Sequence, residues 1–191
     1  MLSQAEKGGV QNTIQNCVTV LQNDPILADS IRLNLLSERI DIVKPMDWQR
    51  SGPTLTDTDM MYILRRMEKY GLYSEKRVSA AIRIVANENH YHPIRDYLND
   101  LKWDGAERIS HALHRFLGAA EDELTAEALK IFLLGAIKRV FHPGCKFEMM
   151  LCLVGGQGAG KSSFFRLLAI KDEWFSDDLR RLDDDNVFRK L

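Results

Sequence analysis

The residues best suited to do chemistry form a short glycine-rich segment late in the sequence. Residues 155–162 read GGQGAGKS and fit the pattern G-x-x-x-x-G-K-[ST]. Polyphosphate needs many hydrogen-bond donors at short range, and backbone N–H groups supply them only where no Cβ blocks the approach. The glycines, with Gln157 and Ala159 between them, are therefore predicted to wrap a phosphate chain with backbone donors.

Two polar side chains complete this predicted phosphate site. We expect Lys161 to reach the β- and γ-phosphates and the Ser162 hydroxyl to ligate Mg²⁺, which takes few protein ligands and keeps several waters. The pattern predicts the phosphates of a nucleotide and Mg²⁺ as ligands. The candidate cofactor-binding residues are Gly155, Gly156, Gln157, Gly158, Ala159, Gly160, Lys161, Ser162 and Ser163.

The segments on both sides of the loop favour a phosphate site over a chance glycine-rich turn before a lysine. An apolar run, 147–154, precedes the glycines, and apolar residues recur at helical spacing from Phe164 to Leu168. A helix after the loop would point its free N–H groups and positive dipole end at the anion. We therefore predict a strand over 147–154 and a helix that begins near Lys161.

Hydrophobic periodicity and capping signals predict a mainly helical N-terminal region over 12–120. The expected helices start near Thr13, Thr56, Ser74, Pro93 and Ile109. Two short apolar pieces, 31–36 and 40–43, predict a small β-hairpin. The polar lead, 1–11, is expected to be disordered.

The remaining part, 121–191, is predicted to be the beginning of a P-loop ATPase domain. Its first helix, over 124–141, carries hydrophobic residues on more than one face and is expected to be largely buried. The fold class is therefore mixed α/β: a mainly helical N-terminal region followed by a strand, a phosphate loop and a helix.

Composition and charge limit the kinds of partner and compartment that can be expected for this chain. The chain has 191 residues and a formal net charge of −1, so no global field indicates nucleic-acid binding. No apolar run approaches the length of a membrane span, and no signal-peptide pattern opens the sequence. Cys17, Cys145 and Cys152 form no C-x-x-C pair and suit a reducing compartment. We therefore expect a cytoplasmic protein with no membrane partner.

Three further groups of residues could bind a ligand, but an ordinary structural role is favoured for each. The acidic residues, more typical of a solvated loop than of an Mg²⁺ site, are Asp177, Asp178, Asp183, Asp184 and Asp185. The histidines, whose spacing matches no common zinc motif, are His90, His92, His111 and His114. The basic residues, a possible DNA track but by default exposed helix faces, are Arg65, Arg66, Lys69, Lys76, Arg77, Arg83, Lys138 and Arg139.

Three stretches resemble the virulence-associated protein E family of phage and prophage origin, which is related to superfamily 3 helicases. They are 92–109 (HPIRDYLNDLKWDGAERI), 141–169 (FHPGCKFEMMLCLVGGQGAGKSSFFRLLA) and 173–179 (EWFSDDL). The resemblance implies ATP and Mg²⁺ binding at 155–162 and a role in DNA replication. It also implies single-stranded DNA and a homo-oligomeric ring as partners.

The sequence departs from the family after the phosphate loop. Family members continue into an acidic, Walker B-type strand, whereas no apolar strand ending in Asp or Glu follows the loop before Leu191. We therefore expect a C-terminally truncated chain and assign no catalytic residue. Beside the helicase-like ATPase, two alternatives stay open: a nucleotide-, DNA- or partner-binding module without turnover, and a less favoured P-loop phosphotransferase.

Overall fold

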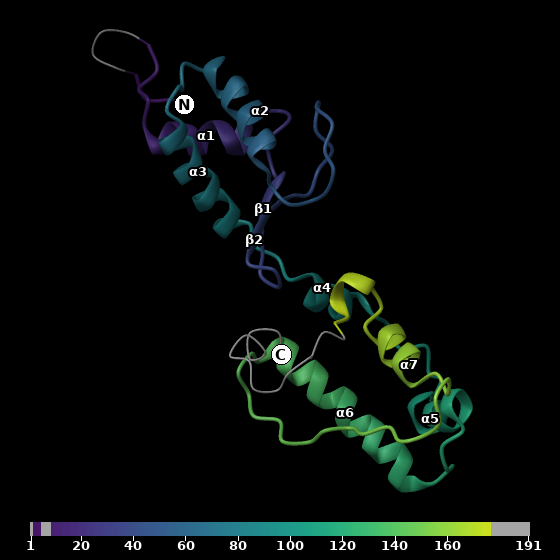
Figure 1. The fold of residues 1–191 in the computed structure, drawn as a ribbon. Helices are drawn as coiled ribbons and strands as arrows, with labels where there is room; N and C mark the ends of the chain where they lie inside the picture. Colours follow the sequence, from purple (N-terminus) through teal and green to yellow (C-terminus); the bar gives the residue numbers. More distant parts are fainter. Residues whose placement is uncertain (1, 5–8, 177–191) are drawn as a thin grey trace. The chain divides into compact units, whose positions relative to one another are not determined.

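The computed structural model describes residues 2–4 and 9–176. The chain divides into two compact units, Met1–Leu101 and Lys102–Leu191 (Figure 1). The predicted mixed α/β class is confirmed, because helices and an antiparallel two-stranded sheet occur together in the part of the chain that the structure describes.

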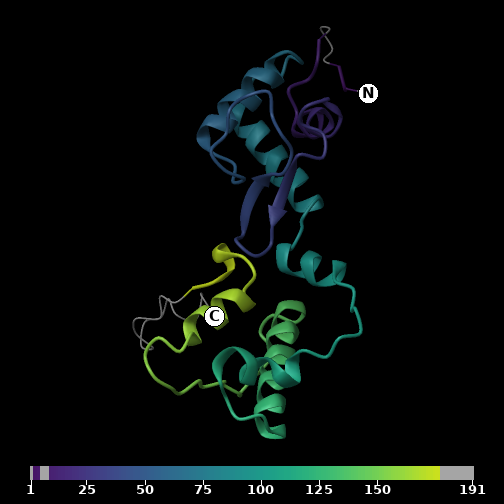
Figure 2. The same cartoon turned by 90° about the vertical axis from the view of Figure 1, so that its right-hand side faces the viewer.

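The N-terminal unit contains the predicted helices and hairpin. Its elements are α1 (Ile14–Asn23), β1 (Ile31–Asn34), β2 (Arg39–Ile42), α2 (Asp57–Glu68), α3 (Glu75–Glu88) and α4 (Pro93–Asp100). The two strands pair antiparallel with Ile31 opposite Ile42, and they lie side by side in Figure 2. This register places both isoleucines in the buried core of the unit.

Local capping explains where two of these helices begin. The Thr56 hydroxyl accepts a hydrogen bond from the Asp59 N–H at 3.2 Å, and the Asp59 carboxylate accepts one from the Thr56 N–H at 2.9 Å. This capping box satisfies two donors that a helix start would otherwise leave unpaired. Before α4, a ring nitrogen of His92 accepts from the Arg95 N–H, and Pro93 occupies the first helical position, where its fixed φ suits the helix.

The Asp59 carboxylate also ties α2 to the preceding loop. It accepts hydrogen bonds from the Trp48 indole at 2.7 Å and from the Arg50 guanidinium at 2.8 Å. Burial alone would raise the pKa of Asp59, but the donors from Arg50, Trp48 and Thr56 outweigh it and hold the pKa well below its usual range. Asp59 is therefore a buried, ionised cap of α2.

A second buried carboxylate, Asp24, joins the end of α1 to α2. It accepts from the Arg66 guanidinium at 2.6 Å and from the Tyr70 hydroxyl at 2.7 Å. Burial acts to raise the pKa of Asp24, yet these donors hold it below its ordinary value. The pair has 17% and 1% side-chain exposure for Arg66 and Asp24, so Arg66 is a structural cation.

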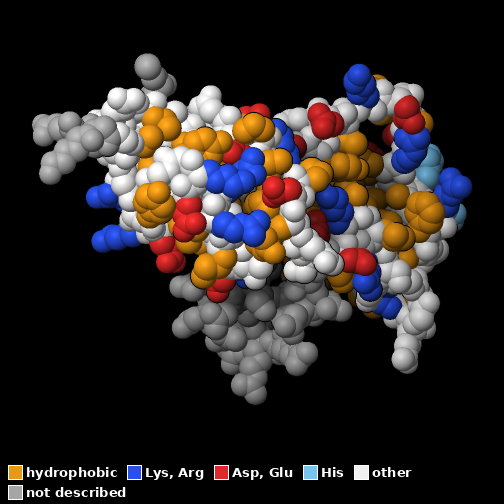
Figure 3. Space-filling model, turned by 90° about the horizontal axis from the view of Figure 1, so that it is seen from above, with side chains coloured by type: hydrophobic (Ala, Val, Ile, Leu, Met, Phe, Trp, Pro, Cys, Tyr) orange, Lys and Arg blue, Asp and Glu red, His pale blue; other side chains and the backbone are white. Residues whose placement is uncertain are grey.

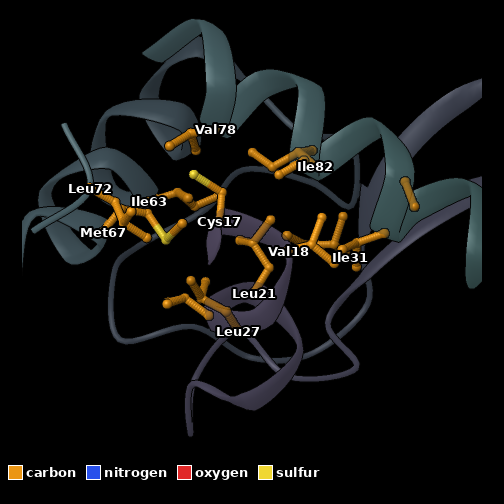
Figure 4. Close-up of a cluster of buried hydrophobic side chains, with 14 of the residues drawn as sticks. Cys17, Val18, Leu21, Leu27, Ile31, Ile63, Met67, Leu72, Val78 and Ile82 are labelled. Carbon is orange, nitrogen blue, oxygen red and sulfur yellow. The ribbon is translucent and has the colours of Figure 1, made fainter. Parts of the chain in front are cut away.

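The core of the N-terminal unit lies where α1 meets α3. Cys17, Val18 and Leu21 of α1 face Val78 and Ile82 of α3 in Figure 4. Leu21 and Val78 are fully buried, and burying such a side chain stabilises a fold by about 1.5–3 kcal/mol. Ile63 and Met67 of α2 close the same cluster.

The N-terminal lead does not behave as the predicted disordered segment where the structure describes it. The Asn16 side chain accepts from the Ser3 N–H at 3.0 Å and donates to the Gln11 carbonyl at 2.7 Å. Because Asn16 is 2% exposed, its amide needs protein partners, and the lead supplies them. Val10 adds an apolar contact with the core.

The C-terminal unit contains α5 (Ile109–Leu117), α6 (Glu123–Phe141), α7 (Lys161–Leu168) and a short 3₁₀-helix, η1 (Asp172–Trp174). Leu113 of α5, Leu129 of α6 and Phe164 of α7 form its buried cluster. The division of the chain lies before the expected boundary at 120/121, because α5 packs on α6. α5 ends where Gly118 adopts the left-handed conformation that favours glycine.

The helix α6 is more exposed than its apolar sequence predicts. Leu129 and Gly135 are its buried residues, whereas Leu124 and Leu134 are 79% and 57% exposed. The prediction of a largely buried helix is therefore wrong, because the apolar cluster of this unit covers one side of α6. In the part of the chain that the structure describes, no helix combines the length and apolar character needed to cross a membrane.

Residues 147–154 form no β-strand, which corrects the prediction of a strand before the loop. The segment runs as irregular chain between α6 and α7 (Figure 1). A strand is stable only when a neighbour pairs with its backbone, and no strand of the described part of this unit does so. Leu151 and Leu153 still pack on the apolar cluster, while Met150 and Val154 are 82% and 97% exposed.

Candidate phosphate-binding site

The glycine-rich segment forms a tight loop that leads directly into α7. Gly158 and Gly160 have φ angles of 82° and 81°, a left-handed conformation that side chains with a Cβ rarely adopt. Gly160 is the N-cap of α7, and within the described residues no side chain caps this helix. The first-turn N–H groups of α7 are therefore available to an external acceptor.

The Lys161 side chain folds back over the loop. Its ammonium donates hydrogen bonds to the carbonyl oxygens of Gly155 at 2.8 Å and Gly156 at 2.7 Å. A lysine ammonium has three donors and no acceptor, so it can exchange these carbonyls for phosphate oxygens without leaving the loop. The first and last parts of the predicted phosphate site are thus brought together in space.

The reason for glycine at the first two positions of the loop differs from the reason at Gly158 and Gly160. Neither Gly155 nor Gly156 has a positive φ, and a Cβ on either would meet no atom within 4 Å in the part of the chain that the structure describes. Packing within the unit therefore does not require glycine at these two positions. A ligand that approaches the backbone closely would require it.

Side chains from other elements hold the loop in place. A Cβ on Gly160 would lie 3.7 Å from a methyl group of Leu117, so the end of α5 stands against the loop. Phe164, one turn into α7, is buried against Leu113 and Leu129. These contacts fix the N-terminus of α7 on the apolar cluster of the unit.

The hydroxyls of Ser162 and Ser163 lie in the first turn of α7 and are exposed. A hydroxyl oxygen is a hard ligand of the kind that Mg²⁺ accepts, so Ser162 fits the predicted role by its chemistry and its position beside Lys161. Among the described residues, no group of three or more Asp, Glu, His or Cys side chains could hold a metal ion. The acidic residues Asp177, Asp178, Asp183, Asp184 and Asp185 lie outside the described part of the chain.

The sequence model of the virulence-associated protein E-like domain matches residues 98–191. This segment belongs to that family. The match confirms the expected resemblance, and it includes the phosphate loop and α7 of the C-terminal unit. No curated protein matches the chain.

Two predicted zinc-site candidates of the virulence-associated protein E-like (VapE-like) domain, His111 and His114, have partners close in sequence. His111 contacts the Glu121 carboxylate at 2.9 Å, and His114 contacts the Ala119 carbonyl at 2.8 Å. In the N-terminal unit, His90 contacts the Asn87 carbonyl at 2.8 Å, and His92 caps α4. Each ring therefore has a local partner that accounts for its position.

Several cations of the candidate DNA track have partners within their own unit. Arg66 is bound to Asp24, Arg65 lies over the Tyr62 ring at 5.1 Å, and Arg77 donates to the Asn12 carbonyl. In Figure 3, Lys and Arg side chains stand among acidic and apolar ones. Lys138 and Arg139 belong to the VapE-like domain, in the other unit. Three of the eight predicted cations thus have partners within the N-terminal unit, and the DNA track stays a prediction.

Sequence reasoning missed a cavity of about 350 Å³ beside the phosphate loop. Side chains of α5 and α6, residues 151–154 and the loop itself line it. Leu113 and Leu117, spaced by one helical turn on α5, were a visible apolar signal in the sequence. These leucines line a cavity because Leu117 approaches the loop, and hydrophobic periodicity does not predict such a tertiary contact.

Proposed function

We propose that the VapE-like domain binds the triphosphate of a nucleoside triphosphate, with ATP as the physiological ligand, on the loop at 155–162. The observation that carries the proposal is the position of the Lys161 ammonium, 2.8 and 2.7 Å from two loop carbonyls. This geometry holds a cation at the centre of a glycine loop whose helix N-terminus carries no side-chain cap within the described residues. A concave array of one cation and several N–H groups suits a polyanion.

Nucleotide binding would replace the carbonyl acceptors of the Lys161 ammonium by phosphate oxygens. The Lys161 ammonium would turn from the carbonyls of Gly155 and Gly156 to the β- and γ-phosphates, while first-turn N–H groups of α7 would donate to the same phosphates. Mg²⁺, held in part by Ser162, would neutralise phosphate charge. The glycines would let the ligand lie against the backbone.

The family resemblance supports a wider role for the parent protein. We place this domain in a helicase-like ATPase of phage-type DNA replication, with single-stranded DNA and further copies of the chain as partners. A specific observation favours a second candidate, a nucleotide-binding module without turnover. Among the described residues, no group of three or more Asp, Glu, His or Cys side chains that could hold a metal ion lies near Ser162.

Calorimetric titration of MgATP into the chain and into Lys161→Ala tests the proposal, with phosphate release assayed on the same samples. Loss of the ammonium should weaken binding by more than about tenfold, because the main charge partner of the phosphates is removed. Lys138→Ala, an exposed lysine of α6, is the matched control and should bind as the parent does. Equal affinity of Lys161→Ala and the parent would overturn the proposal. Phosphate release would support the helicase-like ATPase, and binding without phosphate release would support the module without turnover.

A further inference from the structure

The lining of the cavity beside the phosphate loop is of two chemical kinds. Apolar side chains of two helices line it, including Leu113 and Leu117 of α5 and Ala128 of α6. Gly155 and Lys161 of the loop line it as well. Its volume, about 350 Å³, falls in the range of roughly 300–1,000 Å³ typical of small-molecule sites. A ligand that fills it would combine an apolar part with an anionic part.

We propose that this cavity binds the base and ribose of the nucleoside triphosphate whose phosphates lie on the loop. The inference rests on the proposed function and adds to it the residues that recognise the nucleoside. Leu117 links the two parts, because it lines the cavity and also stands 3.7 Å from the Cβ position of Gly160. A ligand anchored at Lys161 would therefore direct its next group along the end of α5.

The irregular segment that forms one wall can recognise the edge of a base. Residues 151–154 line the cavity, and their backbone N–H and C=O groups pair with no other backbone group among the described residues. A nucleobase carries donors and acceptors along one edge, and it can pair with such a backbone as a neighbouring strand would. The Thr125 side chain adds a hydroxyl to the same lining.

The apolar walls argue for a nucleoside rather than for inorganic polyphosphate alone. A flat heterocycle between Leu113, Leu117 and Ala128 would remove apolar surface from water, which gains about 25 cal/mol per Å². A purely anionic ligand would leave these walls in contact with water. A purely apolar ligand would leave the ammonium of Lys161 and the unpaired backbone groups without a new partner.

A cavity-filling variant tests the inference. Ala128→Leu keeps a strong helix former in α6 and adds bulk inside the cavity, whereas Ala136→Leu adds the same bulk at an exposed position of α6 outside the lining. Calorimetry would compare MgATP with magnesium tripolyphosphate. Ala128→Leu should weaken MgATP binding by about tenfold and leave tripolyphosphate binding unchanged. Ala136→Leu should change neither affinity.

The outcomes separate this inference from the proposed function. If Ala128→Leu bound MgATP as tightly as the parent chain does, the proposed nucleoside site would be overturned, but the proposed phosphate site would not. An equal loss of both ligands in Ala128→Leu would also overturn it, because the cavity would then act only through the loop. Failure of the parent chain to bind either ligand would overturn the proposed function and this inference with it.

A footprint on the parent chain needs no substitution. Cys152 is exposed and lines the cavity, Cys145 is half-buried outside the lining, and Cys17 is fully buried. MgATP should slow alkylation of Cys152 severalfold relative to Cys145, and tripolyphosphate should not. Equal protection of Cys152 by the two ligands, or by neither, would contradict a nucleoside in the cavity.

Discussion

The ring of Phe147 lies against the backbone of Gly135 in α6, where a Cβ on that glycine would overlap it. This contact holds the start of the irregular segment on the helix, and the segment then leads to the phosphate loop. A helix interior ordinarily prefers alanine to glycine by about 1 kcal/mol. The contact with Phe147 therefore explains why position 135 is glycine, although helix propensity favours alanine there.

Gly135→Ala should destabilise the C-terminal unit by about 1–3 kcal/mol, because the Phe147 ring must move or α6 must bend. Hydrogen exchange of the α6 amides would measure the loss within this unit. In a Phe147→Ala background the same change should be neutral or stabilising, because the overlap is absent. Equal costs in the two backgrounds would show that the contact has no effect on stability.

Phe164→Ala should lower the stability of the C-terminal unit by about 3 kcal/mol, since it empties a buried position at the start of α7. The affinity for MgATP should fall with it, because Phe164 holds the loop helix on the apolar cluster. Leu167→Ala, 79% exposed on the same helix, is the control and should change both quantities little. Calorimetric titration and hydrogen exchange on both variants would check the link between packing and binding.

Asp59→Asn should destabilise the N-terminal unit by about 3 kcal/mol near neutral pH, because it leaves the partly buried Arg50 guanidinium without its counter-charge. Asp57→Asn, exposed in the same helical turn, should cost less than about 1 kcal/mol. Urea denaturation followed by Trp48 fluorescence would measure both. A small effect of Asp59→Asn would mean that its hydrogen bonds merely replace those to water.

The same carboxylate predicts a pH dependence. Because the pKa of Asp59 is lowered in the folded protein, its contribution is complete above the ordinary value of 3.8. The contribution is lost as the pH falls from 3.8 through the folded value. Urea denaturation between about pH 7 and pH 2 should therefore show a difference between parent and Asp59→Asn that shrinks as the pH falls below 3.8. A constant difference across the range would contradict the lowered pKa.

Tyr91→Phe should cost about 1–3 kcal/mol, because the Tyr91 hydroxyl donates to the buried Asp41 carboxylate at 2.7 Å. Burial, and then the bond to Asp41, raises the pKa of Tyr91 to about 12. Its contribution is thus complete below the ordinary value of 10.0 and is lost as the pH rises through about 12. Tyr73→Phe, 69% exposed, is the control. Urea denaturation and the ultraviolet titration of phenolate would test both statements.

Sequence patterns predicted the N-terminal unit well because its signals are local. Thr56 and Asp59 form the cap that their spacing indicates, and Pro93 begins α4 as expected. The partners of the buried carboxylates were not predictable. The bond from Arg66 to Asp24 joins residues far apart in the sequence, and periodicity carries no information on such pairs.

The structure of the C-terminal unit differs from the prediction where tertiary contacts, rather than local sequence, determine the conformation. The apolar run at 147–154 has strand-like composition, yet a strand needs a partner, and composition does not supply one. The helix after the loop was predicted correctly, because its apolar spacing and the glycine before Lys161 are local signals. The cavity beside the loop arises from the approach of Leu117 to Gly160, which is a tertiary contact.

The two hydrogen bonds that Lys161 makes to loop carbonyls have a kinetic consequence. Two of the three donors of the ammonium are occupied by Gly155 and Gly156, so Lys161 would have to give up one of these carbonyls before it could donate a second hydrogen bond to phosphate. In the proposed site, nucleotide capture would then have two stages, encounter and the exchange of these hydrogen bonds. At high nucleotide concentration, the rate of capture would be set by this exchange in the loop rather than by diffusion.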